Sequence, residues 1–169
     1  MHVSAPHIYG SALEALDLCH NSSLSFLNVG SGTGYFSSIV ASIMGPKSTN
    51  FGVEIYQDVV QHSKQAIDMW KSSLADPSRI PPLQVFQGNA LYVNHHRGEG
   101  SRGFDRIYIG ASVERSDLSK LICLLKPGGV LVGPGTCLQR RFSPILVISN
   151  ISRLCNHSGR RTCQGRSHP

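Results

Sequence analysis

Three glycines at alternate positions, Gly30, Gly32 and Gly34, directly follow a short apolar run. Glycine tolerates positive φ and lets a ligand approach bare backbone, so this spacing predicts a ligand-binding turn between a strand and a helix. The next apolar run ends at Glu54. In nucleotide-binding α/β folds, an acid at the end of the second strand accepts hydrogen bonds from the ribose hydroxyls. Together the two features favour a nucleotide site over a merely structural turn.

The spacing of the glycines discriminates between nucleotides. Dinucleotide-binding folds carry the pattern G-x-G-x-x-G, in which the backbone approaches a pyrophosphate. This chain has G-x-G-x-G, and Tyr35 occupies the position of the later glycine. S-adenosylmethionine has no pyrophosphate, and its methyltransferases use the shorter spacing. The pattern therefore favours S-adenosylmethionine over a nicotinamide cofactor.

Other polar residues are weaker candidates for a site. Asn89 can meet an adenine amino group through its side-chain carbonyl, although Gly-Asn is also a common turn. Asp105 stands at the start of an expected strand, where a structural role is favoured over a functional one. His95 and His96 are adjacent on an expected loop, so their side chains point apart and no third ligand is evident. No metal site is expected there, nor at the C-terminal residues that lack zinc-ligand spacing, Cys155, His157, Cys163 and His168.

The elements that must position these residues alternate along the chain. Short β-prone runs predict strands at 25–29, 50–55, 83–87, 104–109 and 129–132. Apolar residues at helical spacing predict helices at 8–19, 35–44, 57–73 and 115–125. Such alternation predicts an α/β fold with a mostly parallel sheet and helices on both faces. Met69 and Trp70, on the third of these helices, are expected to pack in the core.

Length and charge indicate one domain followed by a basic tail. The chain has 169 residues and a net charge of +6, with five cysteines and no apparent secretory signal or membrane-spanning run. A cytoplasmic setting is therefore expected. Residues 1–135 hold equal numbers of acidic and basic residues, whereas 136–169 hold six arginines and no acid. We expect a domain at 1–135 and a largely disordered tail at 136–169, and we favour solvation of that tail over nucleic-acid binding.

Four ordered stretches resemble the protein-L-isoaspartate (D-aspartate) O-methyltransferase family. They are VSAPHIYGSALEAL at 3–16, LNVGSGTGY at 27–35, FDRIYIGASV at 104–113 and LLKPGGVLVGP at 124–134. Details such as Ile8-Tyr9, where the repair enzymes usually carry Met-His, are closer to the domain-containing branch of the family. Gly88-Asn89 likewise stands where the repair enzymes usually carry Gly-Asp.

The resemblance implies a Rossmann-like S-adenosylmethionine-dependent methyltransferase fold. It implies methyl transfer to the free carboxylate of L-isoaspartyl or D-aspartyl residues in damaged proteins, by a monomeric enzyme. Ser4 would orient the substrate carboxylate. The implied substrate-binding residues are Ala5, Pro6, His7 and Ala111, and the implied cofactor-binding residues are Gly30, Ser31, Gly32, Gly34, Tyr35, Glu54 and Asn89.

The sequence also departs from the family's pattern at both ends. The match begins near residue 2, without the N-terminal segment that covers the cofactor in the family, and it stops near Gly135. The family's last strands are replaced by residues that contain one β-like run, 144–149. We therefore expect weak or no methyl transfer by this chain. The alternative function is a cofactor-binding module that recognises proteins, in the way suggested for ubiquitin-ligase adaptors of the domain-containing branch, although no adaptor box is recognisable here.

Overall fold

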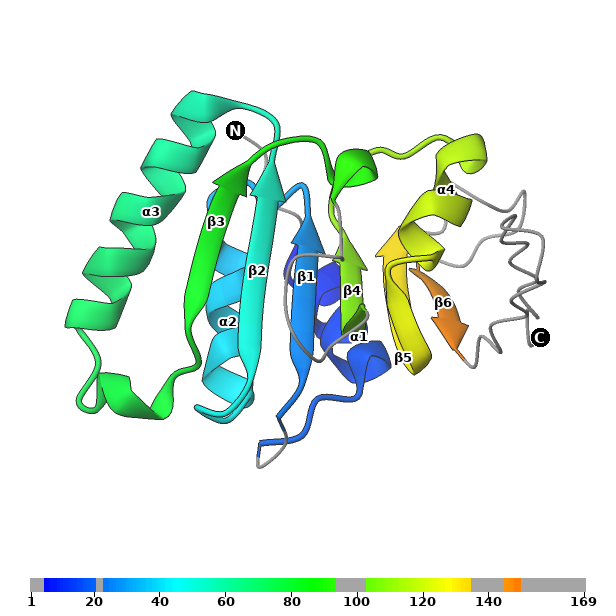
Figure 1. Ribbon diagram of the computed structural model, residues 1–169. Coiled ribbons are helices and arrows are strands. Elements are labelled where there is room, and N and C mark those ends of the chain that lie inside the picture. The colour runs from blue at the N-terminus through cyan, green and yellow to red at the C-terminus, as the bar shows by residue number, and fades with distance from the viewer. Residues whose placement is uncertain (1–4, 21–22, 94–102, 135–144, 150–169) are drawn as a thin grey trace.

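The computed structural model describes residues 5–20, 23–93, 103–134 and 145–149, which form one six-stranded sheet with helices on both faces (Figure 1). The strands are β1 (Ser25–Val29), β2 (Thr49–Glu54), β3 (Leu83–Gln87), β4 (Phe104–Ile109), β5 (Leu125–Pro134) and β6 (Ile145–Ser149). The helices are α1 (Pro6–Leu16), α2 (Tyr35–Ile43), α3 (Gln57–Ser72) and α4 (Arg115–Ile122), with short 3₁₀ turns η1 (Pro77–Arg79) and η2 (Ala90–Tyr92).

The order of the strands, β3-β2-β1-β4-β5-β6, positions the site. The chain builds outward from β1 to β3 and then returns to the other side of β1 to place β4 and β5. Strands β1 to β5 are parallel, and β6 pairs antiparallel with β5. The order reverses between β1 and β4, and ligands of open α/β sheets bind at the carboxyl ends of the strands beside such a reversal.

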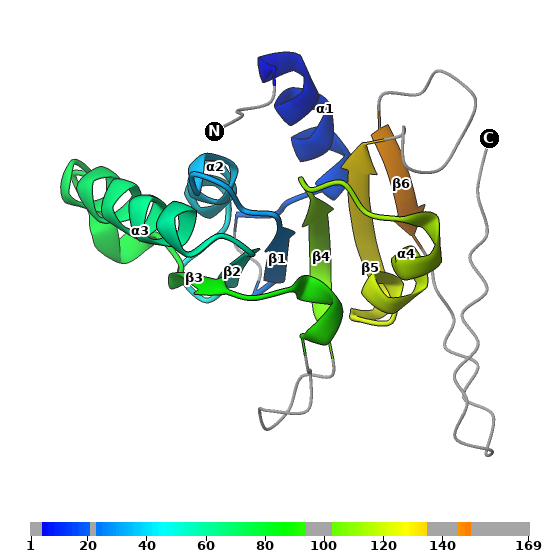
Figure 2. The same cartoon turned by 90° about the horizontal axis from the view of Figure 1, so that it is seen from above.

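Two layers of apolar side chains cover opposite faces of this sheet. Viewed from above, α1, α2 and α3 lie on one side and α4 on the other (Figure 2). Alternate residues of β1 serve the two faces: Phe26 packs with α1 and α2, whereas Leu27 packs in the cluster that includes α4. This period of two explains why strands buried on both faces read as continuous apolar runs in the sequence.

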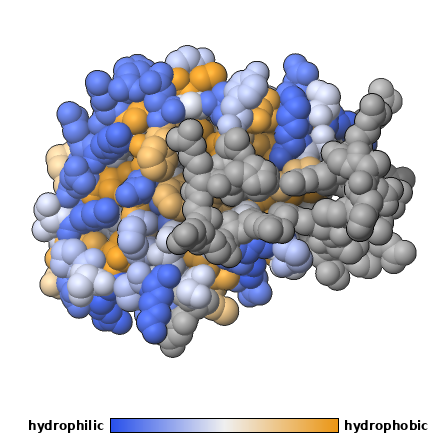
Figure 3. Space-filling view, in the orientation of Figure 1, coloured by the Kyte–Doolittle hydropathy of each residue, from blue (hydrophilic) through white to orange (hydrophobic). Residues whose placement is uncertain are grey.

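The sheet face that carries α4 is only partly covered by the described helices. Figure 3, in the orientation of Figure 1, shows apolar surface over β2 and β3, away from α4. There the ring of Phe86 is 49% exposed, and its centroid lies 6.0 Å from that of Phe51. The helices of the opposite face pack instead on Leu83 and Val85.

Helix α1 ends earlier than the sequence pattern predicts. The expected span was 8–19, whereas the structure has Pro6–Leu16 followed by Asp17 at a φ of 47°. A residue in the left-handed region stops the helix, so Cys19 is not on its apolar face and is exposed. Met69 of α3 also differs from expectation, because it is 68% exposed, whereas Trp70 is partly buried against the core.

Strand β5 begins earlier than predicted because it contains a bulge. Phe104 pairs with Leu125 and Arg106 pairs with Val130, so residues 126–129 form an irregularity opposite Asp105. Gly128, within it, has a φ of 77°. Pro127-Gly128-Gly129, whose composition is typical of a turn, therefore lies in a bulge within the strand.

The bulge places Lys126 beside Asp105. The Lys126 Nζ donates to Asp105 Oδ2 at 2.7 Å, and the same oxygen accepts from the backbone and hydroxyl of Ser25 at 2.8 and 2.7 Å. Burial acts to raise the pKa of Asp105, but these hydrogen bonds and the lysine charge outweigh it and hold the pKa below its ordinary value. Asp105 thus joins β1, β4 and β5, which is the structural role that the sequence favoured.

Strand β6 adds residues 145–149 to the sheet, within the segment that the sequence analysis assigned to the tail. The expected loss of the last strands is therefore incomplete, since the β-like run noted there pairs with β5. Residues 135–144 and 150–169 lie outside the described residues. The domain boundary at 135 stays a prediction.

Candidate ligand-binding site

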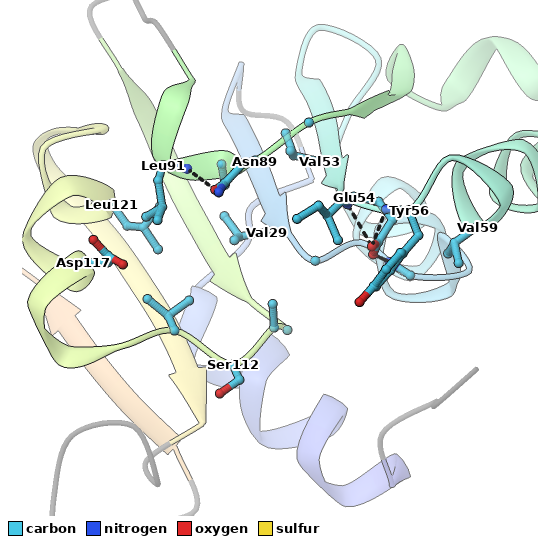
Figure 4. Close-up of a pocket in the computed structure, with 18 of the residues that line it drawn as sticks. Val29, Val53, Glu54, Tyr56, Val59, Asn89, Leu91, Ser112, Asp117 and Leu121 are labelled. Carbon is cyan, nitrogen blue, oxygen red and sulfur yellow. Dashed lines mark hydrogen bonds between the residues drawn. The ribbon is translucent and has the colours of Figure 1, made fainter.

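A pocket of about 570 Å³ lies at the carboxyl ends of the parallel strands. The segments that follow β1, β2, β3 and β4 each contribute to its lining, and α4 supplies a further wall (Figure 4). Its volume is in the range typical of sites for small organic ligands. The pocket occupies the place beside the strand-order reversal where the topology predicts a ligand site.

The glycine-rich turn forms the floor of this pocket, and its glycines have distinct physical reasons. Gly30, Gly32 and Gly34 all have positive φ, at 73°, 53° and 79°. A Cβ on Gly30 would stand 2.5 Å from the Ala111 Cβ, whereas a Cβ on Gly32 would meet nothing within 4 Å. Gly30 is thus required by packing, and Gly32 leaves open space beside the pocket that it lines.

Glu54 closes β2 and turns its buried carboxylate toward this turn. Its Oε2 accepts from the backbone N–H of Gly32 at 3.0 Å. Its Oε1 accepts from the N–H groups of Ile55 and Tyr56 at 2.8 and 3.3 Å. These bonds fix the carboxylate in the pocket wall, and a carboxylate has about four acceptor sites, so capacity for a ligand hydroxyl remains.

Asn89 lines the pocket after β3, in agreement with its predicted position. Its Oδ1 accepts from the backbone N–H of Leu91 at 3.0 Å, which caps the η2 turn. The side-chain carbonyl that the sequence assigned to an adenine amino group is therefore already engaged in the protein. An amide oxygen has two lone pairs, so one acceptor site of this carbonyl remains, and its predicted role stays a prediction.

The wall opposite Glu54 was not predicted from the sequence. Glu114 and Asp117, at the start of α4, line the pocket together with Leu121. Asp117 and Leu121 lie across the pocket from Glu54 and Tyr56 (Figure 4). The Asp117 carboxylate accepts from Lys120 Nζ at 2.7 Å, and this hydrogen bond raises the pKa of Lys120. Three carboxylates and no Lys, Arg or His are found among the described residues that line the pocket, which suits a cationic ligand.

Two exposed apolar residues beside Glu54 were also missed. Ile55 and Tyr56 line the pocket and are 56% and 66% exposed. The sequence signal that could have identified them is their position directly after the acid that ends the second β-prone run, since ligands of such sheets bind at the carboxyl ends of the strands.

Other predicted cofactor residues belong to the turn but do not line the pocket. Gly34 is packed against α3, where a Cβ would stand 2.8 Å from Ile67 Cδ1. The Ser31 hydroxyl is buried and has no hydrogen-bond partner among the described residues. Tyr35 is 53% exposed and lies against Tyr9 of α1, with ring centroids 5.9 Å apart. Their predicted roles stay predictions.

The predicted substrate residues divide in a similar way. Ala111 lines the pocket, whereas Ala5, Pro6 and His7 are exposed at the start of α1 and do not line it. Ser4 lies outside the described residues. The Ala5 carbonyl accepts from the Ile8 N–H at 2.9 Å, and Pro6 occupies the first position of the helix, so this segment is held as a helix start.

The described residues contain neither a metal-binding cluster nor a membrane-spanning helix. No group of three or more His, Cys, Asp or Glu residues there is arranged to hold a metal ion. No helix of the described part is both long and apolar enough to cross a membrane. The histidines at 95 and 96 and the cysteines and histidines at 155–168 lie outside the described residues.

The strand order, the glycine turn after β1 and the acid that closes β2 define a Rossmann-like fold of the S-adenosylmethionine-dependent methyltransferase class. Within this class, residues 1–150 match the family model of protein-L-isoaspartate(D-aspartate) O-methyltransferase. The chain belongs to that family.

Relatives agree with this assignment. The chain is similar to protein-L-isoaspartate O-methyltransferases 1 and 2 of Arabidopsis thaliana, at 33% identity over 138 residues and 31% over 144 residues. These matches cover 78% and 81% of the chain but only 54% and 42% of the relatives, so the chain spans about half their length.

Among solved structures, a protein described as a protein-L-isoaspartate O-methyltransferase from Plasmodium falciparum, in complex with S-adenosyl-L-homocysteine, shares the fold. The TM-score is 0.66 at 22% identity, over 98% of this chain and 72% of that one. A second structure, titled protein-L-isoaspartate O-methyltransferase, has a TM-score of 0.68 at 20% identity, over 88% of this chain and 42% of that one.

Proposed function

We propose that this protein binds S-adenosylmethionine in the pocket and transfers its methyl group to the free carboxylate of L-isoaspartyl or D-aspartyl residues, as a protein-repair enzyme. The observation that carries the proposal is the convergence of the Gly30–Gly34 turn and the Glu54 carboxylate on one cavity. Family membership and the names of the relatives support the reaction class.

The residues of the pocket fit this cofactor. The open space beside Gly32 accepts a ligand against bare backbone, and Glu54 supplies acceptors for ribose hydroxyls. Asn89 supplies an amide oxygen whose second lone pair can accept from an adenine amino group. The acidic lining suits the positive charge of a sulfonium, which is the group that supplies the methyl in this chemistry.

In this reaction the protein contributes mainly by orienting the methyl donor and the acceptor carboxylate. A substrate carboxylate is already ionised at neutral pH, so no general base is required, and none is assigned here. The protein holds donor and acceptor in line and excludes water from the path between them. Ala111 is the described substrate-side residue at the pocket, where it packs directly on Gly30. Ser4 is proposed to orient the carboxylate.

The test is methyl transfer to a synthetic peptide that contains one isoaspartyl residue. The chain is incubated with the radiolabelled methyl donor and this peptide, and the matched control is the same peptide with a normal aspartyl residue. Base-labile label in the isoaspartyl peptide alone is the expected result, at the low rate that the departures of this chain from the family's pattern predict. Calorimetric binding of the donor without any transfer would contradict the enzymatic proposal and favour the alternative, a cofactor-binding module that recognises proteins. The monomeric state, the cytoplasmic setting and the absence of nucleic-acid binding stay predictions.

A further inference from the structure

Arg106 of β4 binds the carboxyl end of helix α1. Its Nε donates to the Leu16 carbonyl, and its guanidinium also donates to the Asp17 carbonyl at 3.2 Å. A third bond, to the Asp105 carbonyl at 3.0 Å, fixes the guanidinium to its own strand. The side chain is only 14% exposed, so these bonds form in a partly desolvated place. One side chain therefore joins the end of α1 to the sheet.

These hydrogen bonds are directional, so they fix the position of α1 along its axis, which the apolar packing of the helix does only weakly. Ala12 and Leu16 are fully buried against the sheet, but apolar contacts are non-directional and fix the position along the helix axis weakly. The last carbonyls of a helix lack partners within the helix and carry its negative dipole end, so a guanidinium there is favourable. The Asp17 carboxylate contributes little, because it lies 4.0 Å away and is 85% exposed.

The other end of α1 reaches the helix that follows the glycine-rich turn. Tyr9, in the first turn of α1, stacks on Phe36 with ring centroids 4.9 Å apart and an interplanar angle of 22°. Tyr9 also contacts Tyr35, so it packs on the first two residues of α2. Helix α1 thus contacts Arg106, on the amino-terminal half of β4, at one end. At its other end it contacts α2, the helix that follows the glycine-rich turn. Its first residues are the predicted substrate segment, 5–7.

We propose that Arg106 is a positioning residue for the substrate side of the site, acting through α1. It holds the carboxyl end of the helix in register, and the contacts of Tyr9 with Tyr35 and Phe36 then fix the start of the helix relative to α2. The inference rests on the proposed methyl transfer for its functional consequence. A positioning residue of this kind acts on substrate orientation and leaves the cofactor pocket, which Arg106 does not line, unchanged.

The experiment compares Arg106→Met, which keeps the aliphatic stem, with Arg106→Lys, which keeps one charged donor. The matched control is Lys126→Met, which removes a partly buried cation from the neighbouring strand without touching α1. Three quantities are measured for each folded variant: amide hydrogen exchange of residues 6–16, the calorimetric Kd of S-adenosylhomocysteine, and the KM and kcat for the isoaspartyl peptide.

Arg106→Met should accelerate exchange in α1 about tenfold and lower kcat/KM for the peptide by about tenfold, with an unchanged Kd for S-adenosylhomocysteine. Arg106→Lys should recover part of both losses. Lys126→Met should lower the melting temperature without changing α1 exchange or the KM for the peptide.

Unchanged α1 exchange in Arg106→Met would overturn the anchoring, whatever the activity of the chain. Faster exchange with an unchanged KM and kcat would overturn the positioning role. If the wild-type chain transfers no methyl group, the proposed function fails while the exchange measurement still decides the anchoring.

Discussion

Gly30 lies against Ala111 so closely that a Cβ on the glycine would stand 2.5 Å from the alanine Cβ and 2.9 Å from its backbone nitrogen. The contact joins the turn after β1 to the turn after β4 across the strand-order reversal. Backbone surrounds the missing Cβ, so neither turn can move aside without changing the pocket.

Gly30→Ala should therefore destabilise the fold. The substituted residue would combine a φ of 73° with an impossible contact, so we expect the free energy of unfolding to fall by about 2 kcal/mol or more. Urea unfolding followed by circular dichroism measures this loss.

Gly32→Ala is the matched variant, because it has the same strain without the clash. We expect about 1 kcal/mol of destabilisation but about tenfold weaker binding of S-adenosylhomocysteine, because the methyl group enters the open space beside the pocket. Equal stability losses for the alanine variants at 30 and 32 would contradict this division.

Glu54→Gln tests the carboxylate of the pocket wall. The substitution replaces one acceptor oxygen by an NH₂ group that would face backbone N–H donors or a ribose hydroxyl, so binding of S-adenosylhomocysteine should weaken at least about tenfold. Calorimetry measures the Kd, and Asp58→Asn, an exposed acid on α3, is the control. A Kd equal to that of the wild type would remove Glu54 from the site.

Asn89→Asp should strengthen cofactor binding. Aspartate keeps the oxygen that accepts from the Leu91 N–H and replaces the amide nitrogen, which is a donor, by a second, charged acceptor oxygen at the pocket. We expect the Kd for S-adenosylhomocysteine to fall several-fold, since charged acceptors make stronger hydrogen bonds. Weaker binding would show that the ligand uses the amide donor of Asn89 instead.

The acid sensitivity of the fold should depend on Asp105. Its pKa is lowered in the folded state, so the unfolded state binds more protons between the folded value and the ordinary value near 4. The stability from Asp105 is therefore present above the unfolded pKa and is lost as pH falls through the folded pKa. Asp105→Asn should be less stable than wild type at pH 7, and the difference should shrink at pH 3. Urea melts across this range check the prediction, and a difference independent of pH would oppose it.

The sequence predicted the bounds of most strands more accurately than it predicted the bulge in β5 and the end of α1. The bounds of β1, β3 and β4 are those expected, because glycine or proline flanks at least one end of each β-prone run. The start of β5 was wrong because Pro127-Gly128-Gly129 has the composition of a turn, and only pairing with β4 shows that it is a bulge. The end of α1 was wrong because Cys19 continues the helical period beyond Asp17, whose left-handed backbone no local pattern announces.

The site was predictable where it is local in sequence. The glycine turn and Glu54 belong to one strand-turn-helix-strand unit, and spacing within that unit carries the signal. Asp117 and Leu121 come from α4, far along the chain, and only the sheet topology brings them opposite Glu54. The engagement of the Asn89 carbonyl by Leu91 was likewise invisible, because it depends on the 3₁₀ turn after β3.

The neighbours Asp105 and Arg106 lie toward the amino-terminal end of β4, whereas the pocket lies at its carboxyl end. One strand thus separates residues that join elements of the fold from residues that line the pocket. In a mutational scan, substitutions at 105 should mainly reduce the amount of folded protein in the cell, whereas substitutions at 112 should mainly reduce the activity of each molecule. Selection for a new substrate could then change the second set while the first preserves the fold on which both depend.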